Sequence, residues 1–164
     1  MNKNKKGFSI IEILVVVSIF AVIGVLTTSA VTLTLRGSRK SESLVRVREN
    51  VNYSLAIIER QIRNSESITT CDGTSSSTLS YTSLEGITAS FSCITPGSAG
   101  YIASGSGRLT SSDISVTACS FTCSQTDANN PQVVRVSVSA EDSTSVATEK
   151  GLVSTDMEII TRNY

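Results

Sequence analysis

One long apolar segment dominates the N-terminal part of the chain. Residues 8–35 carry almost no charge, and Glu12 is the only charged side chain among them. A helix needs about 20 apolar residues to cross a bilayer, whereas the apolar core of a secretory signal has only about 7–15 residues. The pattern therefore predicts a membrane-spanning helix over residues 8–35.

The next segment has the period of an amphipathic helix. Six apolar residues recur at spacings of three and four and would share one helix face. They are Leu44, Val47, Val51, Leu55, Ile58 and Ile62. Because residues 8–66 contain no proline, we expect one helix, whose second part, residues 36–66, lays this face on a globular domain.

From residue 67 the period changes to that of β-strands. Apolar and polar residues alternate, and the segment Leu84-Glu85-Gly86 is typical of a hairpin turn. The pattern predicts strands over residues 78–83, 87–93, 114–118 and 133–138, and more weakly a last strand over 157–160 and a short pairing around 101–102. We expect residues 67–164 to form a small head with an antiparallel sheet packed on the helix, which is the α+β class.

The formal net charge is zero, but the charges are unevenly distributed. Three lysines lie in residues 1–7, whereas residues 67–164 carry four basic and nine acidic groups. The acidic head gives nucleic-acid binding no electrostatic support, although the composition does not exclude a local basic patch on its surface. The lysines favour a cytoplasmic N-terminus, but Arg36, Arg39 and Lys40 flank the other end of the apolar segment, so charge alone decides the orientation only weakly.

The chain offers little for catalysis. It contains no histidine, which is the commonest general base and metal ligand. The cysteines are not arranged as paired CxxC motifs, so a zinc site is disfavoured. We therefore expect no enzyme activity, no metal and no cofactor.

Four cysteines lie in the head: Cys71, Cys93, Cys119 and Cys123. An even number in a serine- and threonine-rich domain outside the cytosol indicates two disulfides. We expect Cys71–Cys93 and Cys119–Cys123, although the second pair would be about 13 Å apart in an extended strand and needs a turn or bulge. Otherwise the pairs cross, for example Cys71–Cys119 with Cys93–Cys123, and the sequence does not choose among the three connectivities.

The N-terminus reads Lys-Gly-Phe-Ser-Ile-Ile-Glu-Ile-Leu-Val-Val after a short basic stretch. This segment resembles the class III signal of type IV prepilins and type II secretion pseudopilins. The resemblance implies that prepilin peptidase cuts after Gly7 and removes residues 1–7 as a leader peptide. Phe8 then becomes the mature N-terminus and is N-methylated by the same enzyme.

The resemblance also gives Glu12 a role in assembly. A charged group inside a membrane segment costs about 2–3 kcal/mol, so it usually has a partner. In a filament, the Glu12 carboxylate can neutralise the amine of Phe8 on a neighbouring pilin subunit. The alternative is that Glu12 bonds to amides in the first turn of its own helix, and the two are compatible.

The same resemblance implies the type IV pilin fold and a location. Before assembly the protein would be a single-pass protein of the inner (plasma) membrane with an extracytoplasmic head, and afterwards part of an extracellular or periplasmic filament. Residues 55–68 look like the corresponding stretch of J-type minor pseudopilins. The alternative is a generic amphipathic helix, in which Glu59 and Arg63 form a surface ion pair.

Two functions follow from these patterns. The first is a structural subunit, major or minor, of a type IV pilus or of a pilus-like secretion or competence filament. The second is a membrane-tethered binding or adhesion module that uses the leader for anchoring, with the head contacting a surface, DNA or polysaccharide. The sequence does not decide which system the protein serves or what the head binds.

Overall fold

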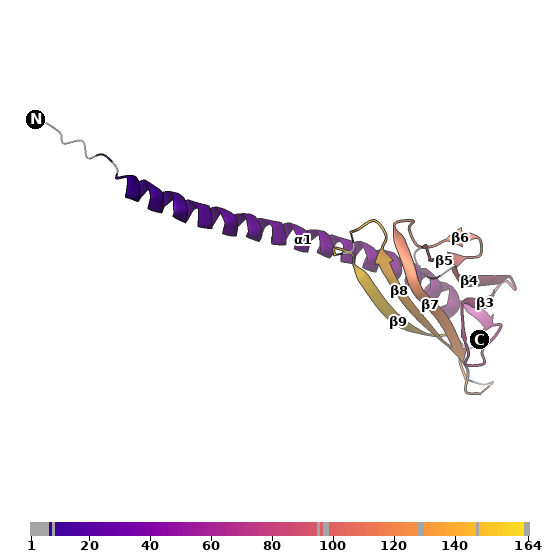
Figure 1. Ribbon diagram of the computed structural model, residues 1–164. Helices are drawn as coiled ribbons and strands as arrows, with labels where there is room; N and C mark the ends of the chain where they lie inside the picture. The colour runs from indigo at the N-terminus through magenta and orange to yellow at the C-terminus, as the bar shows by residue number, and fades with distance from the viewer. Residues whose placement is uncertain are drawn as a thin grey trace, which may run out of the picture. The chain divides into compact units, whose positions relative to one another are not determined.

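The computed structural model describes residues 7, 9–94, 96, 99–127, 130–146 and 148–162. The chain divides into two compact units, the first ending at Arg39 and the second beginning at Lys40. One helix, α1 (Ile10–Arg63), runs through the boundary (Figure 1). The part of α1 in the first unit carries the candidate site, and the second unit is the head.

The predicted apolar face of α1 is confirmed. Its members in the head from Val47 to Ile62 are fully buried, and Leu44 is half-buried. The expected ion pair between Glu59 and Arg63 is present at 2.8 Å. The helix ends at Arg63 rather than near residue 66, because the next residues pair as a strand.

The described residues of the head form two antiparallel sheets, where the sequence predicted a single one. The first sheet has the strand order β1-β3-β4-β5-β6, and the second has the order β2-β7-β8-β9. The first consists of β1 (Ser65–Ile68), β3 (Thr78–Ser83), β4 (Thr88–Ile94), β5 (Tyr101–Ser104) and β6 (Gly107–Arg108). The second consists of β2 (Ser75–Ser76), β7 (Ile114–Ser124), β8 (Val133–Asp142) and β9 (Leu152–Ile160).

Alternation places one face of the second sheet in the core. Along β8 the even-numbered residues from Val134 to Asp142 are buried, while the odd-numbered residues are not. Phe121 of β7 and Phe91 of β4 are among the largest fully buried side chains. The Tyr81 ring stacks on Phe91 with 5.4 Å between centroids, so aromatic rings fill part of the space beside α1.

The expected disulfide pairing is wrong, and β7 gives the reason. The bonds are Cys71–Cys123 and Cys93–Cys119, with Cα atoms 4.5 and 5.7 Å apart. Because β7 runs extended through both Cys119 and Cys123, a four-residue step separates them by about 13 Å. Each therefore pairs with another part of the head, and Cys93–Cys119 links the two sheets.

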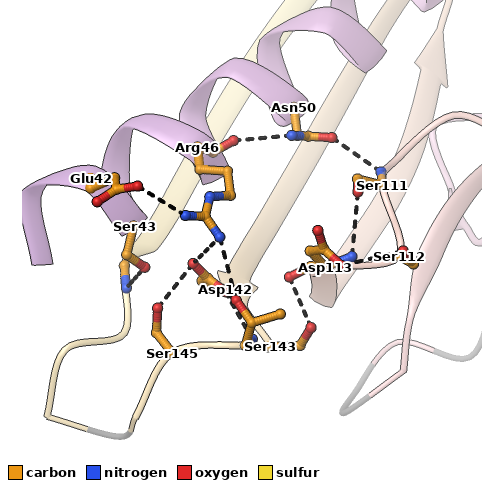
Figure 2. A network of polar contacts seen from close by, with 12 residues as sticks. Glu42, Ser43, Arg46, Asn50, Ser111, Ser112, Asp113, Asp142, Ser143 and Ser145 are labelled. Atoms are coloured by element: carbon orange, nitrogen blue, oxygen red, sulfur yellow. Dashed lines mark hydrogen bonds and ion pairs between the residues drawn. The ribbon is translucent and has the colours of Figure 1, made fainter. Parts of the chain in front are cut away.

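A buried carboxylate fixes the connection between β8 and β9 to α1 (Figure 2). Asp142 is fully buried at the end of β8. Its carboxylate accepts hydrogen bonds from the Thr144 backbone N–H at 2.8 Å, the Thr144 hydroxyl at 2.6 Å and the Ser145 hydroxyl at 3.0 Å. The Arg46 guanidinium of α1 lies 3.7 Å away. We call Asp142, Thr144, Ser145 and Arg46 the β8–β9 latch.

Close backbone packing reinforces the latch. The Gly151 N–H donates to the Ser43 hydroxyl of α1 at 2.8 Å. A Cβ atom on Gly151 would lie 2.5 Å from the backbone nitrogen of Leu44, so no larger residue fits without movement of the backbone. The loop between β6 and β7 is also bound to α1, because the Asn50 side-chain oxygen accepts a hydrogen bond from the Ser111 N–H at 3.1 Å.

The latch predicts an acid-dependent loss of stability. Burial raises the pKa of Asp142, but hydrogen bonds from Thr144, Ser43 and Ser145 lower it by more, from 3.8 to about 2. The ionised Asp142 carboxylate therefore stabilises the folded head fully above about pH 4. This stabilisation is lost as the pH falls through about 2, where the carboxylate is protonated in the folded protein. We expect the ionised group to contribute roughly 2 kcal/mol to the free energy of unfolding.

The measurement is urea unfolding of the full chain in detergent micelles from pH 6 to pH 2, followed by tyrosine fluorescence. Asp142→Asn should be less stable at pH 6 and should lose less stability between pH 4 and pH 2. If the free energy of unfolding changed with pH in the same way for both proteins, Asp142 would not be the group that causes the loss of stability in acid.

Gly151→Ala should destabilise the head by about 1–3 kcal/mol, because the added methyl group meets the backbone of α1. Gly107→Ala is the matched control, since a Cβ atom there would lie at an ordinary 3.5 Å from the Ser104 carbonyl oxygen. Urea unfolding at pH 7 compares the two. Equal losses would show that close packing at Gly151 is not the cause.

Candidate processing and assembly site

The candidate site lies at the start of α1. The Ser9 carbonyl accepts hydrogen bonds from the N–H groups of Glu12 at 3.0 Å and Ile13 at 3.3 Å, which closes the first turn. Glu12 therefore stands where the free N–H groups of a helix carry partial positive charge. A carboxylate is favoured there by about 0.3–1 kcal/mol.

The structure places two of the three predicted residues. Gly7 is exposed, and a Cβ atom there would have nothing within 4 Å. Glu12 is also exposed, and no described residue donates a hydrogen bond to its carboxylate. The alternative of a bond from Glu12 to its own first-turn amides is therefore not seen among the described residues. Phe8 lies outside the described residues.

The helix after Glu12 presents apolar side chains on all sides. In the first unit large residues are exposed throughout, for example Ile10 at 83 %, Phe20 at 70 % and Leu33 at 69 %. So large an apolar surface is unfavourable in water and indicates contact with lipid or with other proteins. By length and composition this helix can cross a membrane. These features support membrane anchoring.

Six hydroxyl groups in the apolar segment are satisfied within the helix. Each bonds to a carbonyl oxygen three or four residues earlier, at 2.8 or 2.9 Å. They belong to Ser18, Thr27, Thr28, Ser29, Thr32 and Thr34. Because these groups need no water, they are compatible with a bilayer core. Glu12 is then the one side chain between residues 9 and 35 whose charge needs an external partner.

Comparison with known proteins places this site in a recognised class. Residues 2–28 match the prokaryotic N-terminal methylation motif, and Gly7, Phe8 and Glu12 all lie within the match. This motif is the class III prepilin leader, typical of type IV pilins and pseudopilins. The α+β architecture, with a long N-terminal helix and antiparallel sheets, is consistent with the type IV pilin fold. No curated protein and no solved structure shows a significant match.

The head adds residues that sequence reasoning missed. The latch was not anticipated, because an acidic residue at the end of a strand usually faces solvent. The one local signal is the series Asp142-Ser143-Thr144-Ser145, whose side chains commonly bond to nearby backbone N–H groups. All four cysteines are disulfide-bonded. Among the described residues, no group of three histidine, cysteine, aspartate or glutamate side chains is placed to hold a metal ion.

Processing predicts a definite mass for the mature protein. Intact-mass spectrometry of membrane-extracted protein should show loss of residues 1–7, one added methyl group on Phe8 and the absence of four thiol hydrogens. Gly7→Leu should keep the leader, because a side chain is then present where the peptidase must approach the backbone. A wild-type protein that retains residues 1–7 would contradict the processing.

Proposed function

We propose that the protein is a structural subunit of a type IV pilus or of a pilus-like secretion or competence filament. The methylation motif at the start of an exposed apolar helix is the observation that carries the proposal. In this role the subunit is cut by prepilin peptidase, waits in the membrane and enters the filament through α1. Other pilin subunits, of the same or another kind, are its partners.

The chemistry of the site explains why cutting and assembly are coupled. Cleavage after Gly7 creates a positive amine on Phe8, four residues before Glu12. In a filament, the Glu12 carboxylate of one subunit neutralises the amine of a neighbour inside an apolar core. A buried charge pair adds little net stability, because both charges lose their water. However, any alignment of neighbouring helices that leaves one of these charges unpaired is strongly disfavoured. In this role Glu12 determines how the helix of one subunit is aligned with the helix of the next.

We place the head outside the cytoplasm. Two disulfides support this, because such bonds persist in oxidising compartments. The three lysines of residues 1–7 support a cytoplasmic leader. Removal of the leader leaves 11 of the 14 basic groups against 14 acidic groups, so the exported protein is acidic.

We also propose that the protein is not an enzyme. The chain has no histidine, and its cysteine thiols are consumed in disulfides. These absences remove the commonest general base and the most reactive nucleophile. The net negative head likewise gives DNA no general electrostatic attraction. The role we assign is therefore mechanical, with binding by the head as a further capacity.

Glu12→Ala should leave cleavage intact but strongly reduce the amount of protein in filaments sheared from the cell surface, because the neighbour's amine loses its counter-charge. Immunoblots of the sheared and membrane fractions measure both effects. Glu49→Ala is the control, since Glu49 is an exposed acidic residue of the same helix in the head.

Two results would count against this proposal. Normal incorporation of Glu12→Ala would show that the carboxylate does not act in assembly. A wild-type protein that stays in the membrane fraction of cells that do make filaments would favour the membrane-tethered binding module.

A further inference from the structure

Strand β9 forms an edge of the second sheet. It pairs with β8 over nine residues without a shift in register. Within the described part of the chain, no strand pairs with its other side, and β9 borders the head in Figure 1. An edge of this length is a ready template for another strand.

The register shows which backbone groups face outward. At one end the Asp142 N–H donates to the Gly151 carbonyl at 3.2 Å, and at the other the Thr161 N–H donates to the Gln132 carbonyl at 2.9 Å. Because hydrogen-bonded pairs alternate along an antiparallel ladder, the odd-numbered residues of β9 bond to β8. The even-numbered residues therefore direct their N–H and C=O groups away from the sheet: Leu152, Ser154, Asp156, Glu158 and Ile160.

The other edge strands among the described residues are protected or very short. The N–H and carbonyl of Ile68 on β1 bond to the Gln132 side chain at 2.7 and 3.3 Å. Strands β2 and β6 have two residues each. By contrast, β9 contains no proline, no lysine and no bulge, which are the usual means of blocking an edge.

The side chains of β9 define what can bind there. Asp156 and Glu158 are exposed on the outer face of the sheet, and Glu158 also pairs with Arg135 at 3.0 Å. On the inner face Thr155 and Met157 are only half-buried, between the buried Val153 and Ile159. An added strand would set its own side chains on these two faces. Basic residues would suit the outer face and apolar residues the inner face.

A second copy of β9 suits this edge poorly. Antiparallel pairing of two β9 strands about their central residue would place the two Asp156 carboxylates directly opposite each other, with each Glu158 opposite Ser154 and diagonal to the Asp156 of the other copy. Like charges directly opposite each other destabilise a strand pair. The charges thus favour a basic partner over self-association.

We propose that the free edge of β9 is a docking site for an extended segment of a partner protein, in which basic and apolar residues alternate. The segment would add a strand to the second sheet, with its backbone bonded to the even-numbered residues of β9. The proposal requires only the folded head. It therefore stands or falls independently of assembly through Glu12.

The test uses the full chain in uncharged detergent micelles and a nine-residue peptide of alternating lysine and valine, matching β9 in length. Amide hydrogen exchange is measured by nuclear magnetic resonance. We expect the peptide to slow exchange at the N–H groups of Ser154, Asp156 and Glu158. A peptide with glutamate in place of lysine should have no such effect.

Two variants test the backbone and the charge separately. Ser154→Pro removes one outward N–H without breaking a bond to β8, and should weaken peptide binding about fivefold to tenfold. Ser154→Ala is its matched control, because both variants lose the contact at 2.5 Å between the Ser154 and Ser139 hydroxyl oxygens. Asp156→Lys keeps the backbone and should also weaken binding.

Several outcomes would overturn the proposal. One is no protection of the three N–H groups by the lysine peptide, or equal protection by the glutamate peptide. Another is equal binding by Ser154→Pro and Ser154→Ala. Protection that rises with protein concentration in the absence of peptide would show that a second copy occupies the edge instead.

Discussion

The head depends on the burial of one apolar stripe of α1. Five residues of this stripe are fully buried, and they share a single core with side chains from both sheets. Each buried valine, leucine or isoleucine contributes about 1.5–3 kcal/mol relative to exposure. The disulfides restrict the unfolded chain, which adds stability to a small domain with few large apolar residues. The latch then fixes the loop before β9 to the same helix.

The same helix meets two different environments, and its sequence changes accordingly. In the first unit the apolar residues surround the helix, and the hydroxyl groups bond back to the helix backbone. In the head the apolar residues narrow to one stripe, and charged residues occupy the other faces. The only charge inside the apolar segment is Glu12, which gives this segment its one ionisable side chain.

Sequence patterns predicted the features that depend on local periodicity. The stripe, the hairpin around Gly86 and the strands near residues 78–83 and 133–138 follow from spacing alone. Gly7 and Glu12 were singled out as candidate site residues because the leader is a contiguous motif, and both lie within the matched segment. The division into two sheets and the short strand β1 were not predicted, and the disulfide pairing was predicted wrongly, because these features depend on which strands become neighbours. The latch and the free edge escaped prediction for the same reason, since Asp142 and Ser154 acquire their roles only from the topology.

The disulfide connectivity has a consequence for the biogenesis of the protein. Both bonds use a cysteine of β7, which joins Cys71 and Cys93 to partners 52 and 26 residues later in the chain. A ribosome completes Cys71 and Cys93 before either partner exists. Oxidation at that stage would join the first two cysteines to each other, and thiol–disulfide exchange would have to undo the error. If Cys71 and Cys93 are oxidised before β7 has emerged, the final pairing is reached only by thiol–disulfide exchange, whereas oxidation of the complete head avoids that step.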